Sequence, residues 1–197
     1  MSAKIIALYG GAFDPFHNGH LATVALLLNS GLAHEVVVVP SGDRPDKSSR
    51  ASGAQRLAMV RLGIQDSFAG DARVSVSDLH VSGQVGYGTI DVVDHYKQVH
   101  ARDVVVVVGQ ELIEDLSQWK ESGRLKSAAR FLVTPRPGYP HPVMPEGWDI
   151  EVLTPSYEDA VLVSSSSLRS LLREGMSCAG LMPSPVVRYC LENGLYR

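Results

Sequence analysis

Short apolar runs alternate with longer segments of helical periodicity along most of the chain. Five runs are rich in valine and isoleucine and lack alternating polar positions, which is typical of β-strands covered on both faces. They are Lys4–Tyr9, Glu35–Val39, Arg73–Val76, Asp103–Val108 and Arg130–Val133. Asp149–Leu153 is a candidate sixth strand. The pattern therefore predicts a sheet of five or six buried strands.

Segments with helical patterns separate these runs. They are His20–Ser30, Ala54–Ser67, Thr89–Val99, and Glu111–Leu116 followed by Arg124–Ala129. Strands that alternate with helices form parallel βαβ units. The sequence thus predicts an α/β fold with a doubly wound parallel sheet.

The last part of the chain has a different pattern. Ser164–Glu174, Gly180–Leu181 and Ser184–Asn193 indicate helices with no strand between them. A helical C-terminal region over about 164–197 is expected. At about 150 residues per domain, a chain of 197 residues corresponds to one domain.

Composition and charge narrow the class of protein. Hydrophobic residues make up 45% and charged residues 20% of the chain, which excludes a disordered chain, a collagen and a coiled coil. With 18 Lys and Arg against 21 Asp and Glu, the net charge is −3. Proteins that bind nucleic-acid backbones are usually basic, so we expect no nucleic-acid partner.

Cysteine content and apolar run lengths predict a cytoplasmic protein with no membrane association. Cys178 and Cys190 are too few for a disulfide scaffold and lack zinc-ligand spacing; we expect two reduced core thiols. The longest apolar run, Val104–Val108, falls far short of the about 20 residues of a membrane span. The apolar run near the N-terminus is also too short for a signal peptide.

The segment Gly10–His20 follows the first predicted strand and precedes a helix. In open parallel sheets, ligands bind outside the carboxyl ends of the strands. The two glycines let a ligand approach the backbone, and Asn18 can cap a helix that begins near Gly19, where N–H groups favour phosphate. His17 and His20 could then contact that phosphate. A tight turn and a His-x-x-His metal site are the alternatives; the dinucleotide and P-loop fingerprints do not match.

A serine-rich helix start lies in the tail at 164–167, with Arg169 in the first turn. Hydroxyl groups, backbone N–H groups and a guanidinium fork suit a polyphosphate. Alone, such serines more often form a loop or a helix cap.

Together the two segments resemble the signatures of the nucleotidyltransferase superfamily. Residues 10–20 are similar to its G-x-F-x-P-x-H-x-G-H motif, and residues 163–169 to its Ile-Ser-Ser-Thr-x-x-Arg motif. A wider resemblance to bacterial nicotinate-nucleotide adenylyltransferases covers nearly the whole chain. It includes Gly109–Gln110–Glu111 with Trp119, the Arg136–Pro137–Gly138 segment, and the ending from Leu181 to Arg197.

The resemblance implies a Rossmann-like nucleotidyltransferase fold that transfers the adenylyl group of ATP to nicotinic acid mononucleotide. The products would be deamido-NAD and pyrophosphate, a step of NAD biosynthesis, and Mg²⁺ would accompany ATP. A phosphate nucleophile is already anionic, so catalysis would rest on positioning and charge stabilisation.

Residue roles follow from the resemblance. The catalytic candidates are His17, His20, Lys47 and Arg169. Those for ATP are Gly10, Gly11, Ala12, Phe13, Gly19, Gly109, Arg136, Ser165 and Ser166. Those for the mononucleotide are Tyr87, Thr89, Glu111 and Trp119, although Trp119 could also be a core residue. No protein ligand to the metal is predicted.

Four residues depart from the family pattern, all where the resemblance places the acceptor. Asp46 replaces a histidine, His80 an acidic residue and Gly88 a tyrosine, and Glu111 is one methylene longer than the family's aspartate. Nicotinamide mononucleotide, phosphopantetheine or another phosphate therefore stays open as acceptor. A nucleotide-binding sensor without turnover is a second alternative.

Overall fold

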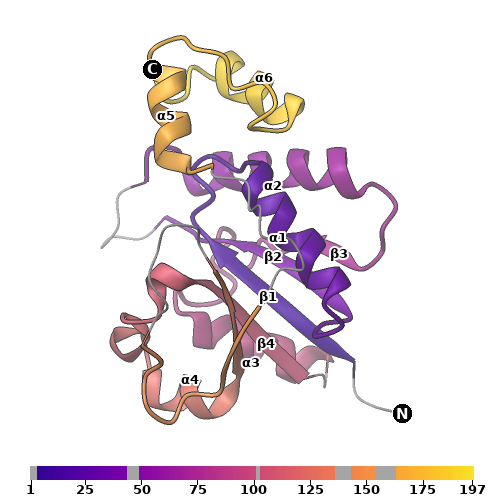
Figure 1. The fold of residues 1–197 in the computed structure, drawn as a ribbon, viewed down its shortest axis with the longest axis vertical. Coiled ribbons are helices and arrows are strands. Elements are labelled where there is room, and N and C mark those ends of the chain that lie inside the picture. Colours follow the sequence, from indigo (N-terminus) through magenta and orange to yellow (C-terminus); the bar gives the residue numbers. More distant parts are fainter. Residues whose placement is uncertain (1–3, 44–48, 101–102, 136–142, 154–162) are drawn as a thin grey trace.

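The computed structural model describes residues 4–43, 49–100, 103–135, 143–153 and 163–197. Its centre is a six-stranded parallel sheet with the strand order β3-β2-β1-β4-β5-β6, drawn in Figure 1. The strands are β1 (Ile5–Gly11), β2 (Glu35–Pro40), β3 (Val74–Val76), β4 (Asp103–Gly109), β5 (Arg130–Thr134) and β6 (Ile150–Val152). All five predicted strands and the candidate sixth are confirmed, within boundary shifts of one or two residues.

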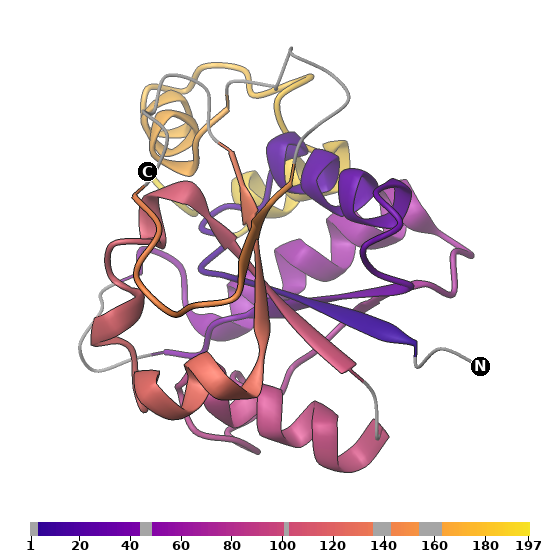
Figure 2. The ribbon, with the colours of Figure 1, turned by 60° about the horizontal axis from the view of Figure 1, so that its bottom comes forward.

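Helices cover both faces of the sheet, as Figures 1 and 2 show. On one face, Ala7 and Tyr9 pack with α1 (Asn18–Asn29) and α2 (Gly53–Phe68). On the other, Ile6 and Leu8 pack with α3 (Thr89–His100) and α4 (Ser122–Ala128). Because successive residues of a strand point to opposite faces, both sets must be apolar. This explains the runs without polar alternation.

Two further helices, α5 (Ser165–Arg173) and α6 (Ser184–Glu192), lie at one end of the molecule beyond α2 (Figure 1). Their buried side chains join the same hydrophobic cluster as α1 and α2. Cys190 on α6 lies 3.5 Å from the sulfur of Met59 on α2. The predicted helical tail thus packs on the α1–α2 side of the sheet.

The segment 110–118 differs from the prediction of a helix over Glu111–Leu116. It forms two 3₁₀ turns, η1 (Gln110–Leu112) and η2 (Leu116–Gln118). Ile113 and Leu116 are both fully buried. Their spacing of three residues matches the 3₁₀ repeat, which places positions i and i+3 on one side.

Two other predictions about helices differ from the structure. Gly180–Leu181 is not helical; Gly180 has a φ of +78°, which a right-handed helix cannot accommodate. The first residue of α1 is Asn18 and its N-cap is His17, so Asn18 is not the cap. Its side-chain amide instead donates to the carbonyl of Gly180 at 2.8 Å.

Candidate active site

The neighbouring strands β1 and β4 define the point where the winding of the sheet reverses. From β1 the chain continues to β2 on one side, and from β4 to β5 on the other. Tyr9 pairs with Val107, so Gly10, Gly11 and Gly109 all lie at the carboxyl edge. Ligands of doubly wound sheets bind at this position.

The loop after β1 folds back on itself through Phe13, which has a φ of +53°. Its ring is buried edge-on against Tyr9, with centroids 5.4 Å apart. A Cβ at Gly11 would lie 2.8 Å from that ring, too close for any side chain. Ala12, between them, stays exposed. Gly11 is therefore needed for the shape of the loop.

His17 and His20 stack at the start of α1, with ring centroids 3.7 Å apart and planes 22° from parallel. Nδ1 of His20 accepts the backbone N–H of His17 at 3.1 Å. An accepting Nδ1 carries a lone pair, so in the neutral ring the proton is on Nε2. A Cβ at Gly19 would lie 3.0 Å from the His17 ring. This packing fixes the His20 ring with Nε2 as a donor.

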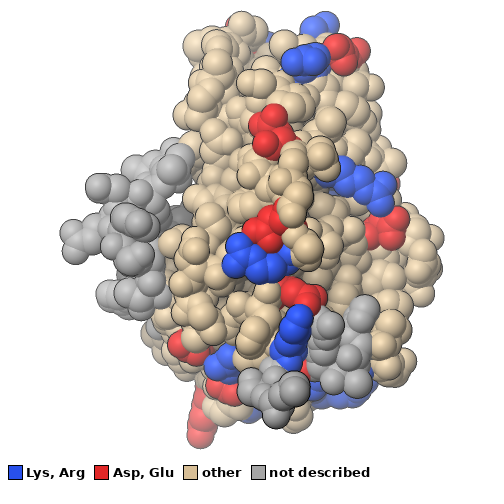
Figure 3. Space-filling model, turned by 90° about the vertical axis from the view of Figure 1, so that its right-hand side faces the viewer, with Lys and Arg blue, Asp and Glu red and all other residues tan. Residues whose placement is uncertain are grey.

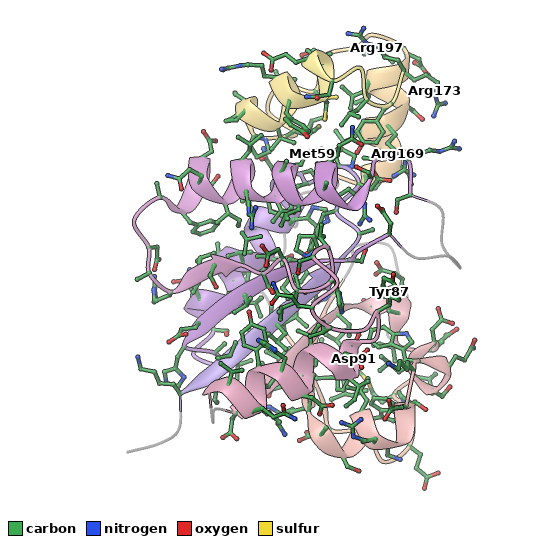
Figure 4. The ribbon with its side chains drawn as sticks, turned by 180° about the vertical axis from the view of Figure 1, so that it is seen from behind. Met59, Tyr87, Asp91, Arg169, Arg173 and Arg197 are labelled. Carbon is green, nitrogen blue, oxygen red and sulfur yellow. The ribbon has the colours of Figure 1, made fainter. Side chains whose placement is uncertain are left out.

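Helix α5 meets this loop directly. Ser165 donates to the carbonyl of Pro15 at 3.0 Å, and Arg169 donates to the carbonyl of Asp14 at 2.8 Å. A second guanidinium nitrogen of Arg169 donates to the hydroxyl of Ser166 at 3.0 Å. The two segments that resemble superfamily motifs therefore form one unit, near Met59 of α2 (Figure 4).

Asp14 lies in the same loop and holds it in place, a role that the sequence analysis did not assign to it. Its buried carboxylate accepts the backbone N–H of Arg50 at 2.8 Å and of Ala51 at 3.2 Å. It also accepts the hydroxyl of Tyr196 at 2.6 Å. Burial, and then this hydrogen bond, hold the pKa of Tyr196 well above its ordinary value. Asp14 thus bonds the loop both to the segment that precedes α2 and to Tyr196 near the end of the chain.

Arg56 on α2 was also missed, although it is fully buried. Its guanidinium uses all five N–H donors. They bond the carbonyls of Ala51, Ala12 and Gly42, the hydroxyl of Ser41 and the carboxylate of Asp43, at 2.9 to 3.2 Å. A buried cation with every donor satisfied ties the loops after β1 and β2 to α2.

The mononucleotide candidates lie on the α3–α4 side of the same edge. Tyr87 is 52% exposed and Thr89 is the first residue of α3. Trp119 is partly buried against the core on that side. The exposed Glu111 folds back so closely that a Cβ at Gly109 would lie 2.6 Å from its carboxylate. Figure 4 shows Arg169 and Tyr87 on the same side of the molecule.

His80 and Gly88, two of the unusual positions, are neighbours. Nε2 of His80 lies 3.4 Å from the carbonyl of Gly88. A Cβ at Gly42 would lie 2.4 Å from the carbonyl of His80, so the loop after β2 also packs here. Lys47, Arg136 and Asp46 lie outside the described residues.

Other features bear on metal, membrane and nucleic-acid partners. No three His, Cys, Asp or Glu side chains within the described ranges gather as metal ligands. In the same ranges, no helix is long and apolar enough to cross a membrane. On the face drawn in Figure 3, basic and acidic side chains are interspersed.

Comparison with known sequences first gives the class of protein. The model of the cytidylyltransferase-like family matches residues 8–171. The match spans well over half of the chain, so the protein is a member of that family.

More similar relatives specify the particular family. Proteins named probable nicotinate-nucleotide adenylyltransferase from Desulfitobacterium hafniense and Sodalis glossinidius are 30% and 29% identical to the chain. The alignments cover 98% of this chain in both cases, with 96% and 97% of the relatives. The chain belongs to the nicotinate-nucleotide adenylyltransferase family, which confirms the resemblance seen in its sequence.

Solved structures confirm the fold. The nicotinic acid mononucleotide adenylyltransferase of Plasmodium falciparum, solved in complex with NaAD, superposes with a TM-score of 0.80 at 23% identity. The superposition covers 98% of this chain and 97% of that chain.

Proposed function

We propose that this protein transfers the adenylyl group of ATP to nicotinic acid mononucleotide, forming deamido-NAD and releasing pyrophosphate. The observation that carries the proposal is the contact of α5 with the loop after β1. Two segments suited to phosphate, one at each end of the chain, meet at the edge where doubly wound sheets bind nucleotides. Family membership supports the same reaction.

The chemical step is an in-line displacement. A 5′-phosphate oxygen of the mononucleotide attacks the α-phosphorus of ATP and forms a new P–O bond. The bond to the bridging oxygen breaks, and pyrophosphate leaves with the electron pair. The nucleophile is anionic before it reacts, so no side chain has to remove a proton. The protein contributes position and donors to the developing charge.

The loop after β1 supplies the donors nearest to the reacting phosphate. Nε2–H of His20 would contact the α-phosphate, because Nδ1 is already engaged with the backbone of His17. His17 would contact the neighbouring phosphate. Backbone N–H groups of Gly11, Ala12 and Phe13, and the start of α1 at Gly19, would complete the cradle.

The β- and γ-phosphates would lie at the start of α5. Ser165, Ser166 and Arg169 would bind them and stabilise the departing pyrophosphate, with the Arg169 fork held in place by Asp14 and Ser166. Lys47 would add a cation, and Gly109 with Arg136 would lie near adenine, on the strength of the family resemblance.

The acceptor would lie on the α3–α4 side. Trp119 and Tyr87 would flank the pyridine ring, the start of α3 at Thr89 would face its carboxylate, and Glu111 would bond the ribose. Mg²⁺ would enter as a complex with ATP, bound by phosphate oxygens and water. That is compatible with Asp14, the acidic group of the loop, being engaged by three protein donors.

Two statements about the whole protein belong to the same proposal. We expect residues 1–197 to act as one domain, since the buried residues of α5 and α6 share a core with β1, α1 and α2. We expect a cytoplasmic location, because Cys178 and Cys190 are free thiols, the state that a reducing compartment maintains.

Product analysis tests the function. The purified protein is incubated with Mg·ATP and one of three acceptors: nicotinic acid mononucleotide, nicotinamide mononucleotide or phosphopantetheine. Pyrophosphate release is followed, and the product is separated by chromatography. Deamido-NAD is expected as the main product. Turnover of phosphopantetheine alone would reassign the acceptor, and ATP binding without pyrophosphate release from any acceptor would indicate a sensor.

A further inference from the structure

Lys120 directly follows Trp119 in the chain, and its side chain reaches the start of α3. Its ammonium lies 2.9 and 3.0 Å from the two carboxylate oxygens of Asp91. The same carboxylate accepts the backbone N–H of Gly88 at 2.8 Å. Asp91 therefore fixes both the lysine and the turn that leads into α3. Figure 4 shows Tyr87 and Asp91 close together at this place.

The lysine fills space that two glycines leave open. A Cβ at Gly88 would lie 2.8 Å from Cδ of Lys120, and a Cβ at Gly86 would lie 3.2 Å from its nitrogen. Side chains at positions 86 and 88 would push the lysine away. The absence of a side chain at Gly88, where the family has a tyrosine, thus leaves room for the Lys120 side chain. This lysine follows η2 and places a cation on the side of the site proposed to bind the mononucleotide.

The ammonium has donor capacity beyond its partner. It carries three N–H groups, and the two oxygens of Asp91 accept two of them. The Lys120 side chain is 51% exposed, so a ligand can reach it. Two residues proposed to bind the pyridine carboxylate end lie beside it: Trp119, proposed to flank the ring, precedes it in the chain, and Thr89, proposed to face the carboxylate, follows Gly88, which the lysine contacts.

We propose that Lys120 is a specificity-determining residue whose ammonium recognises the ring carboxylate of the acceptor. This rests on the proposed function, because it assumes that a pyridine mononucleotide binds between Trp119 and α3. The acid and amide mononucleotides share ring, ribose and phosphate. The acid form carries one negative charge that the amide lacks. A nearby cation therefore favours binding of the acid and not of the amide.

The size of the effect follows from exposure. Charge pairs in contact with water are weak and screened by salt. We therefore expect a three- to tenfold contribution, about the size of a partly exposed charged hydrogen bond. The backbone N–H groups at the start of α3 remain available to the carboxylate in any variant.

The experiment compares four proteins: the parent, Lys120→Met, Lys120→Arg and Lys97→Met. Methionine keeps most of the aliphatic stem without the charge, and arginine keeps the charge. Lys97 lies on α3 and donates to the carbonyl of Ala128 on α4, so its replacement removes the same charge elsewhere. Values of kcat and KM are measured for the acid and amide mononucleotides at low and high salt.

For Lys120→Met we expect kcat/KM for the acid to fall three- to tenfold, mainly through KM, while the value for the amide stays within twofold. High salt should reduce the parent's preference for the acid over the amide until it approaches the preference of Lys120→Met. Lys120→Arg should retain most of the preference, and Lys97→Met all of it.

Three results would overturn the proposal. They are an equal loss with both nucleotides, which would indicate contact with the shared phosphate; no loss with either; or a loss in Lys97→Met as large as in Lys120→Met. A parent protein that turns over neither nucleotide would instead refute the proposed function, and the assignment of Lys120 with it.

Discussion

Arg169 donates a hydrogen bond of 2.8 Å to the backbone carbonyl of Asp14, 155 positions earlier in the chain. This contact holds the start of α5 against the loop after β1. It also fixes one nitrogen of the guanidinium fork, while a second bonds Ser166 at 3.0 Å. Two protein acceptors therefore orient the fork, and in the proposed role of Arg169 this would reduce the entropy lost when ATP binds.

Replacement of Arg169 by lysine should raise KM for ATP about tenfold or more, because a point charge replaces a planar fork that makes several charge-assisted bonds. The control is Arg173→Lys, one turn further along α5, where the side chain is exposed (Figure 4). Titration of both variants with ATP checks the prediction. Unchanged ATP affinity in Arg169→Lys would show that this residue does not contact the triphosphate.

Replacement of His20 by alanine should lower kcat by about 10²–10³-fold, the typical cost of removing one preorganised donor to a developing charge. Rates are measured at saturating ATP and acceptor, with His95→Ala on α3 as the control. His20 also stacks on Phe16, so the unfolding midpoint of each variant is measured in parallel. A folded His20→Ala protein within tenfold of the parent would refute this role.

Much of the fold could be predicted because it depends on local patterns. Buried parallel strands must be apolar on both faces, so a run such as Val104–Val108 can be recognised as a strand from the sequence. Segment 110–118 could not be predicted in the same way, because a spacing of three residues between Ile113 and Leu116 fits both an α-helix and a 3₁₀ turn. Both side chains are fully buried, as they would be on one side of either conformation, so their apolar character alone does not distinguish the two.

For the candidate site, the sequence could propose residues where they belong to a contiguous motif. His17, His20 and the glycines belong to one segment. Asp14, Arg56 and Lys120 instead bond partners far away in the chain, and nothing in a single sequence identifies such pairs. Arginine in a helix is usually exposed, and the one available sign was that Arg56 lies among the apolar positions of α2.

Replacement of Arg56 by methionine should destabilise the protein by about 3 kcal/mol or more, because it leaves several buried carbonyl groups without donors. The control is Arg61→Met on the same helix. Arg61 pairs with Asp78 at 3.0 Å and is 55% exposed, so its loss should cost less than about 1 kcal/mol. Denaturant unfolding of both variants measures the difference, and equal losses would contradict the role assigned to Arg56.

Stability should fall as pH rises above 10, the ordinary pKa of tyrosine. Burial raises the pKa of Tyr196, and also that of Tyr9. The folded protein then keeps a proton that the unfolded chain loses. The contribution of each such tyrosine to the free energy of unfolding is complete below pH 10. Above pH 10 this contribution falls by about 1.4 kcal/mol per pH unit.

The variant Tyr196→Phe should lack the part of this pH dependence that is due to Tyr196. Its stability is expected to be lower at neutral pH by about 1 kcal/mol, through loss of the bond to Asp14, but to decline less steeply above pH 10. Identical slopes in the parent and Tyr196→Phe would contradict this assignment.

Adenylyl transfer to nicotinic acid mononucleotide can be tested by a competition assay between the two pyridine mononucleotides. The protein is given Mg·ATP with equal concentrations of the acid and amide mononucleotides. The ratio of deamido-NAD to NAD formed at early times equals the ratio of the two kcat/KM values. We predict a clear excess of deamido-NAD. Equal amounts, an excess of NAD, or neither product would contradict the account.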